Sequence, residues 1–243
     1  INCLFQMYYW KITLIISASY RTDIPAFYAK WFSNRMAAGY FDVVNPYSGK
    51  THRISQSTQN IQAFVFWTRN IVPFLENLDT LSKQNLPFAV QFTVTGYPRI
   101  LEKTVPKTEL AIKQIKNISN LYGIRSVIWR YDPIVFTSKT TPRFHQENFK
   151  KIASQLAGIV DEVCLSWINI YRKTARNLNY AAISNQFEWQ EPNKYKKKSL
   201  LCELANIAQN YGIKATICSQ PDLLSGILEP ARCIDLNRLS DIA

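Results

Sequence analysis

Short apolar runs alternate with amphipathic segments along almost the whole chain. Runs with the length and the β-branched or aromatic content of strands occur at residues 12–16, 63–67, 88–95, 126–131, 162–170 and 213–218. Between them, segments such as 106–122 carry apolar residues at the 3.6-residue period of a helix. Strands that alternate with helices predict an α/β fold with a parallel sheet.

Other segments fit this alternation less regularly. A helix is expected to begin at Pro25, and the run at 40–44 predicts a further strand followed by a polar, hairpin-like segment. Residues 175–198 show no clean period, which is typical of a lid or a mobile connection. Residues 231–243 have room for an eighth short strand and the start of a helix.

Polar side chains at alternate positions of the predicted strands distinguish two kinds of parallel sheet. Gln91, Thr93 and Thr95 alternate with apolar residues. An open sheet covered on both faces would bury these groups against helices, whereas a barrel can point them into its lumen. We therefore expect a single TIM-like (β/α) barrel of seven to eight parallel strands, closed or incompletely closed. It would comprise residues 12–243, after an N-terminal extension at 1–11.

The composition indicates where in the cell the protein works and which kinds of partner it binds. The 243 residues suit one barrel, and no apolar run is long enough to span a membrane, so we expect a cytoplasmic protein. A formal net charge of +12 favours an anionic partner, either a small molecule or nucleic acid. The five cysteines form no CxxC pair, and with two histidines no metal-ligand spacing appears, so no metal site is expected.

Charged side chains follow two of the predicted strands, where α/β proteins place their active sites. Arg21 and Asp23 follow the first strand, and Arg130 and Asp132 share one face at the end of another. These four residues are the catalytic candidates. Arg130 would grip a carboxylate or phosphate, and Asp132 would handle a proton. Two structural interpretations stay open, an Arg130–Asp132 salt bridge and the capping of a helix by Asp23.

A wider set of polar side chains would line the same rim of a barrel. Arg69 and Arg172 lie at the exits of two other strands, so several arginines would converge on one mouth and suit an anionic ligand. The expected substrate-binding residues are Asn45, Arg69, Tyr97, Asn169 and Arg172.

A basic run favours a different function. With Tyr195 between them, its lysines could follow a nucleic-acid backbone and stack a base, whereas a solvated loop is the alternative interpretation. The nucleic-acid-binding candidates are Lys194, Lys196, Lys197 and Lys198. The chain has no GxGxxG or GxxxxGKS/T motif and no GxSxG elbow, which disfavours a glycine-rich phosphate loop and a serine nucleophile elbow.

Several sequence blocks resemble a bacterial family known as domain of unknown function 1848. The blocks are ISASYRTDIPAFYAKWF at 16–32, NPYSGK at 45–50, VFWTRN at 65–70, QFTVTGYPRILE at 91–102, VIWRYDPI at 127–134 and YRKTARNL at 171–178. The resemblance implies a barrel-like α/β fold related to radical-SAM proteins, and it brings no established activity. The residues it carries over are Arg21, Asp23, Asn45, Arg69, Arg130, Asp132 and Arg172.

The resemblance also implies a cofactor. Family members usually continue past the segment at 233–235 into a cysteine-rich tail similar to the iron–sulfur motif of spore photoproduct lyase-like enzymes. We therefore expect this chain to be C-terminally truncated; loss of the cluster is the alternative. An iron–sulfur cluster and S-adenosylmethionine are expected in a full-length form, and no cofactor is evident in this chain. Cys202, Cys218 and Cys233 are too widely spaced in the sequence to replace the tail.

Three functions follow, in order of preference. The first is a cytosolic enzyme that binds an anionic substrate at the arginine-rich mouth, with radical-SAM chemistry in the full-length form. The second is a nucleic-acid-binding or repair-associated barrel that uses the basic region 172–198. The third is a metal-independent hydrolase that uses Asp132 and Asp23.

Overall fold

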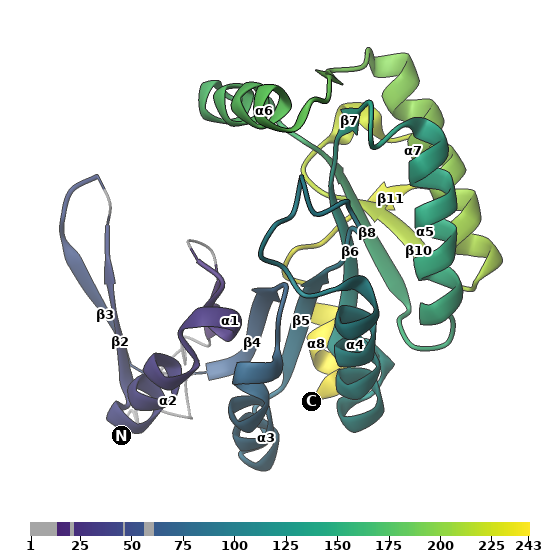
Figure 1. Cartoon of the computed structure of the whole chain (residues 1–243). Helices are drawn as coiled ribbons and strands as arrows, with labels where there is room; N and C mark the ends of the chain where they lie inside the picture. The colour runs from purple at the N-terminus through teal and green to yellow at the C-terminus, as the bar shows by residue number, and fades with distance from the viewer. Residues whose placement is uncertain (1–13, 20–21, 46, 56–60) are drawn as a thin grey trace, which may run out of the picture.

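One parallel sheet of seven strands organises the computed structural model of the chain, which describes residues 14–19, 22–45, 47–55 and 61–243 (Figure 1). The strands neighbour one another in chain order: β1 (Leu14–Ser17), β4 (Ile61–Thr68), β5 (Phe88–Thr93), β6 (Val127–Ile134), β8 (Glu162–Trp167), β10 (Lys214–Ile217) and β11 (Glu229–Pro230). The predicted α/β fold with a parallel sheet is confirmed. In the described residues this sheet is open, with β1 and β11 at its two edges.

Helices cover one side of the sheet, which we call the outer face. They are α2 (Ala29–Ala38), α3 (Leu75–Lys83), α4 (Thr108–Tyr122), α5 (Pro142–Leu156) and α7 (Lys194–Asn210). Every second residue of a strand points to the same side, and on this side the strands present large groups such as Phe64, Trp129 and Trp167. These side chains are buried in one apolar cluster with the helices, and this burial is the main stabilising contribution.

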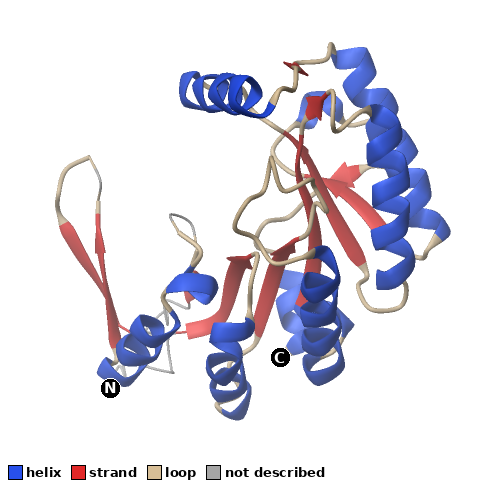
Figure 2. Cartoon of the chain, viewed as in Figure 1, coloured by secondary structure: helices blue, strands red, loops and turns tan. Residues whose placement is uncertain are grey.

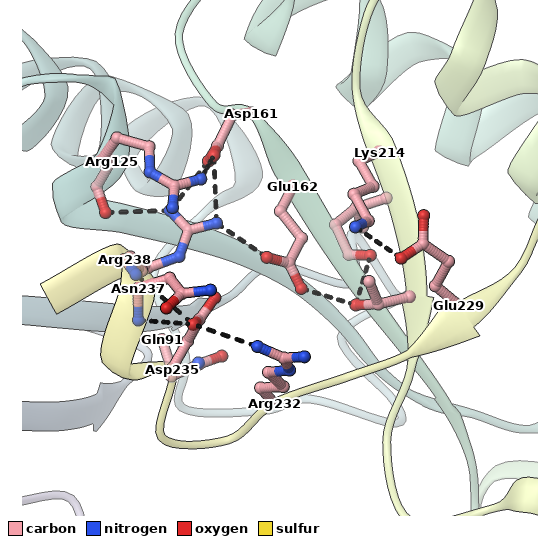
Figure 3. A network of polar contacts seen from close by, with 12 residues as sticks. Gln91, Arg125, Asp161, Glu162, Lys214, Glu229, Arg232, Asp235, Asn237 and Arg238 are labelled. Carbon is pink, nitrogen blue, oxygen red and sulfur yellow. Dashed lines mark hydrogen bonds and ion pairs between the residues drawn. The ribbon is translucent and has the colours of Figure 1, made fainter. Parts of the chain in front are cut away.

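The opposite side of the sheet, the inner face, carries shorter side chains. A second cluster forms there and consists of Ala63, Val65, Ala89, Ile128, Cys164 and Leu239. Leu239 belongs to α8 (Leu236–Ile242), which lies on the side of β5 and β6 away from α4 (Figure 1). Arg238 of the same helix bonds Asp161 and Glu162 at the start of β8 (Figure 3). Helix α8 therefore covers the amino end of the inner face.

The run at 40–44 forms a strand outside the parallel sheet. β2 (Tyr40–Val44) pairs antiparallel with β3 (Thr51–Ser55), and this hairpin projects away from the sheet (Figures 1 and 2). Arg53 bonds Asp42 across the pair at 2.8 Å. The strand does not join the parallel series because a tight turn, and not a helix, follows it.

Residues 175–198 contain regular elements, in contrast to the expected lid or mobile connection. α6 (Arg172–Asn185) fills the first part, and β9 (Trp189–Gln190) pairs with β7 (Phe136–Thr137). Helix α7 then begins at Lys194, where the Asn193 side chain caps it. No residue of α6 is fully buried, and its half-buried face consists mostly of small or polar side chains, which makes the helical pattern weak in the sequence.

Short elements complete the described chain: α1 (Ile24–Phe27) and the 3₁₀ helices η1 (Val72–Phe74), η2 (Ile124–Ser126) and η3 (Pro221–Leu223). Close to the expected eighth strand and final helix lie β11 and α8. The N-terminal extension at 1–11 lies outside the described residues. Within the described ranges, no helix is both long and apolar enough to cross a membrane.

Candidate functional site

Arg130 and Asp132 form an ion pair on the inner face, at the carboxyl end of β6. The alternation of the strand puts both side chains on this face, and Arg130 is only 5% exposed. Its Nη2 lies 2.5 Å from Asp132 Oδ2, and its Nη1 donates to Gln91 Oε1 at 3.2 Å. The salt bridge is therefore present. A buried guanidinium needs such partners because an unpaired buried ion is strongly destabilising.

Asp132 is oriented by several neighbours and stays partly open to solvent. Its Oδ2 accepts from Arg130, and its Oδ1 accepts from the Ser166 hydroxyl of β8. The Asp132 carbonyl accepts from Arg69 Nη2 at 3.4 Å. The carboxyl side chain is 25% exposed. A carboxylate held in this way at the edge of a sheet can accept a proton from a bound molecule.

Asp23 has two structural roles. Its Oδ1 accepts a hydrogen bond from the backbone N–H of Ala26, so the capping interpretation is observed at the start of α1. Its Oδ2 accepts from the backbone N–H of Arg69 at 2.9 Å. Asp23 therefore ties the loop after β1 to the loop after β4. Arg21, the other candidate of this loop, lies outside the described residues.

Arg69 extends from the end of β4 into the lining of a cavity at the same edge. Its Nη1 lies 2.6 Å from Glu102 Oε1, and Glu102 also accepts from the Thr95 hydroxyl. The cavity holds about 160 Å³, and Arg99 and Lys107 line it with the first turn of α4. Lys107 precedes α4 without a side-chain cap, so the N–H groups of that turn keep their capacity to bind an anion.

Tyr97 also lines this cavity, and its hydroxyl holds the backbone after β6. The hydroxyl donates to the Pro133 carbonyl at 2.8 Å and accepts from the Val135 N–H at 3.3 Å. Burial raises the pKa of Tyr97 well above its ordinary value. The phenol is therefore neutral and fixes the shape of the edge.

The other predicted binding residues have different positions. Asn45 lies in the turn of the β2–β3 hairpin, where its Oδ1 accepts from the Tyr47 N–H. It is not at the rim, because the strand before it belongs to that hairpin. Asn169 and Arg172 are exposed, between β8 and the first turn of α6. The residues that the structure brings together are Asp23, Arg69, Arg130 and Asp132.

The basic run forms the first turns of α7. Lys194 and Lys196 are exposed. Lys197 Nζ lies 2.8 Å from Glu191, and Lys198 Nζ donates to the Leu224 carbonyl at 3.2 Å. Half of the run is therefore engaged within the chain, and the other half faces solvent.

Three cysteines gather next to Arg130, a cluster that was not predicted from the sequence. Cys164 lies opposite Arg130 in the register of β6 and β8, and Cys218 follows β10. Cys218 Sγ lies 3.5 Å from Cys233 Sγ, and hydrogen bonding to Cys218 raises the pKa of the Cys164 thiol. The wide sequence spacing hid this cluster. The available signal was the alternation of β6 and β8, which puts Cys164 and Arg130 on one face.

Negative charge in this cluster is concentrated on one sulfur. Hydrogen bonds from the Cys164 and Cys233 thiols lower the pKa of Cys218, and the same bonds raise the pKa of both donors. Burial lowers the pKa of Arg130, but Cys164 and Asp132 outweigh this effect and hold it above its ordinary value. The Arg130 guanidinium therefore lies between the Asp132 side chain and the cysteine cluster.

The cysteine cluster does not fit an iron–sulfur centre. In the described part of the chain, no group of three or more His, Cys, Asp or Glu side chains could hold a metal ion. Cys164 of this cluster lies opposite Arg130 in the register of β6 and β8, so a cation held there would meet the positive charge of the guanidinium nearby. Ligands for the cluster that the family resemblance implies would have to lie outside the described residues.

These features define an α/β protein with a parallel sheet in chain order and a charged site at its carboxyl edge. The chain belongs to the family described as Domain of unknown function (DUF1848), whose model matches residues 15–243. This match confirms the resemblance seen in the sequence blocks. No curated protein matches the chain.

Proposed function

We propose that this chain is a barrel-type enzyme domain that binds an anionic substrate at the carboxyl edge of its sheet. The strands follow chain order without the reversal of a doubly wound sheet, which supports an incompletely closed (β/α) barrel. Barrel enzymes carry out their chemistry at this edge. The observation that carries the proposal is the convergence of Arg69, Arg130 and Asp132 there.

The cavity at this edge has a lining that suits a small anion. Its basic residues Arg69, Arg99 and Lys107 outnumber its acidic residues Glu102 and Glu109 by 3 − 2 = 1. Glu102 is already paired with Arg69. A phosphate or carboxylate would therefore meet net positive charge together with the N–H groups at the start of α4.

Asp132 does not line this cavity and is linked to it through Arg69. Oriented by Arg130 and Ser166, Asp132 would accept a proton from the part of a bound molecule that reaches the inner face. Arg130 would hold that carboxyl group in place through its hydrogen bonds. Iron–sulfur and S-adenosylmethionine chemistry stays a prediction for a longer chain, and neither the role of Asp132 nor that of Arg130 depends on it.

Calorimetric titration with a panel of phosphorylated and carboxylated metabolites tests the binding. Lys107→Gln removes one charge from the cavity and should weaken Kd about tenfold, since a charge-assisted hydrogen bond contributes about 1.5–3 kcal/mol. Arg143→Gln on α5, which breaks an exposed pair with Glu147, is the matched control and should leave Kd unchanged. Absence of binding by every anion, or equal effects of the two variants, would contradict the proposal.

The chemical role of Asp132 needs a separate assay. Asp132→Asn should retain the bound anion and lose its conversion, followed by mass spectrometry of the ligand. Conversion by the wild type without iron would favour the hydrolase that uses Asp132 and Asp23. Conversion only with iron and S-adenosylmethionine, by a longer chain, would favour radical chemistry.

Nucleic-acid binding is a second candidate, which the exposure of α6 and of the start of α7 favours. Arg172, Lys194 and Lys196 are exposed, and Tyr195 is 82% exposed. Such a surface can contact phosphates and stack a base. Fluorescence anisotropy with single-stranded DNA and RNA should show affinity that falls steeply with salt, and Lys194→Gln with Lys196→Gln should reduce that slope. Binding that is absent or insensitive to salt would exclude this function.

A further inference from the structure

The cysteine cluster beside Arg130 has no role in the proposed function, and its sulfurs differ in accessibility. Cys218 and Cys233 are half-buried, whereas Cys164 is 2% exposed. Cys218 and Cys233 therefore lie closer to the surface of the chain than Cys164. Cys202, also half-buried, contacts Ser225 instead of the cluster, so it offers an internal control.

Cys218 and Cys233 lie in two loops that start side by side. Cys218 follows β10, and Cys233 lies between β11 and α8. β10 and β11 are parallel neighbours, and the Ala231 N–H donates to the Ile217 carbonyl at 2.9 Å. The two sulfurs are 3.5 Å apart and need to approach by about 1.5 Å to reach the length of a disulfide bond. Loop backbone can absorb that movement more easily than a central strand.

The surroundings of Cys218 favour its thiolate, the reactive form of cysteine. The Cys164 and Cys233 thiols, the Ser219 hydroxyl and the Arg130 guanidinium all hydrogen-bond its sulfur, and its pKa is lowered for this reason. Hydrogen bonding to Cys218 also raises the pKa of Cys233, which therefore keeps its proton. The two accessible sulfurs are thus an attacking thiolate and a neighbouring thiol.

We propose that Cys218 and Cys233 are a thiol–disulfide exchange site for low-molecular-weight disulfides. The Cys218 thiolate attacks one sulfur of the small disulfide, which forms a mixed disulfide and releases the other half as a thiolate. That thiolate takes the Cys233 proton, and the Cys233 sulfur then attacks Cys218 and releases the second half. The second half leaves as a thiolate and takes a proton from water, so the small disulfide is reduced to two thiols and the dithiol is oxidised to a Cys218–Cys233 disulfide.

The experiment uses the whole reduced chain, freed of reductant and exposed to oxidised glutathione near pH 7. Alkylation of the remaining thiols and peptide mass spectrometry should identify a disulfide between Cys218 and Cys233. Cys218 should react about tenfold faster than Cys202, because its thiolate fraction is larger. Cys233→Ser should stop at the mixed disulfide on Cys218, and Cys202→Ser should behave like the wild type.

Several results would overturn the proposal. A disulfide with another partner, or equal rates at Cys218 and Cys202 in the wild type, would show that the cluster is not an exchange site. Protection of the three sulfurs that disappears on chelation, without any disulfide, would identify a metal site instead. The wild-type peptide map needs no variant, so a substitution that fails to fold leaves the test intact. Neither readout depends on anion binding at the cavity, so failure of one proposal is distinguishable from failure of the other.

Discussion

Buried ionisable side chains are neutral on the outer face of the sheet and charged on the inner face. On the outer face, the imidazole Nε2–H of His145 donates to the Val135 carbonyl, so its Nδ1 accepts from the Tyr131 hydroxyl. Burial lowers the pKa of His145 to about 4 and raises the pKa of Tyr131, so both are neutral. On the inner face, Arg130 and Arg238 are at most 5% exposed and remain charged.

Intrinsic pKa values account for part of this difference, since a tyrosine is neutral and an arginine is charged near pH 7 even in water. The partners of the buried groups account for the rest. The outer groups meet aromatic rings and uncharged polar atoms, whereas the inner groups meet opposite charges. The inner face itself has two ends. Arg238 is engaged by Asp161, Glu162 and a backbone carbonyl at 2.7–2.9 Å (Figure 3). Arg130 instead faces Asp132, which solvent can reach, and the accessible thiols. At the amino end of the inner face, the ion pairs of Arg238 hold α8 in place. At the carboxyl end, the charged groups around Arg130 are available for chemistry.

Removal of Arg238 should have the largest effect. Arg238→Met removes the buried cation that pairs with both Asp161 and Glu162; Asp161 keeps Arg125 at 2.6 Å, so we expect the free energy of unfolding to fall by about 3–4 kcal/mol. Urea denaturation measures this change. Arg232→Met, in an exposed pair with Asp235 at 4.0 Å, is the control and should cost less than about 0.5 kcal/mol. A similar cost for both variants would show that α8 does not depend on this network.

Arg130→Met should destabilise less than Arg238→Met. It leaves one carboxylate, Asp132, which is already 25% exposed and keeps its bond to Ser166, so we expect about 2–3 kcal/mol. Alkylation of Cys218 should also become slower, since its thiolate loses the guanidinium. Urea denaturation and timed alkylation measure the two effects. Unchanged reactivity in a folded variant would mean that the thiols alone control Cys218.

The outer face should lose stability in acid through His145. Its pKa is about 4 in the folded chain and about 6.5 when unfolded, so the unfolded state binds more protons between these values and stability falls as the pH drops through that window. From about pH 7 to pH 5 this contribution should be about 2 kcal/mol. His145→Phe should remove it in urea titrations at both pH values, whereas His52→Gln in the exposed hairpin should not.

Substitution of two buried or partly buried serines, one on each face of the sheet, should have the smallest effects on stability. The Ser166 hydroxyl donates to the Asp132 carboxylate on the inner face, and the Ser119 hydroxyl donates to the neutral Ile159 carbonyl at 2.7 Å under the outer helices. Ser166→Ala should cost about 1.5–2 kcal/mol and Ser119→Ala about 1 kcal/mol, because bonds to charged acceptors are stronger. Thermal denaturation gives both values, and the reverse order would argue against a charged Asp132.

Hydrophobic periodicity predicts most strands and helices of the fold. It does not predict the β2–β3 hairpin or α6. The strands at 63–67, 126–131 and 213–218 appear within a few residues of their predicted positions, because each buries one or both faces. β2 has the same local pattern, but pairing with β3 depends on the turn that follows it. α6 was missed because its half-buried face contains few large apolar residues, so its apolar stripe is weak.

The candidate site was predictable where strand ends define it. Arg69, Arg130 and Asp132 converge because the carboxyl ends of parallel strands meet at one edge. The closeness of Cys218 and Cys233 comes from the pairing of β10 with β11, which their spacing of 15 residues does not indicate. The network of Arg238 likewise joins residues far apart in the chain.

Helix α6 has a dynamic consequence. Since none of its residues is buried, little free energy separates its helical form from a locally unfolded one. Its amides should exchange with deuterium far faster than those of α5, whose Phe149 and Ile152 are fully buried. Any partner that binds along Arg172–Asn185 would slow that exchange. This helix is therefore a built-in reporter, and hydrogen exchange could locate an unknown partner before its chemistry is known.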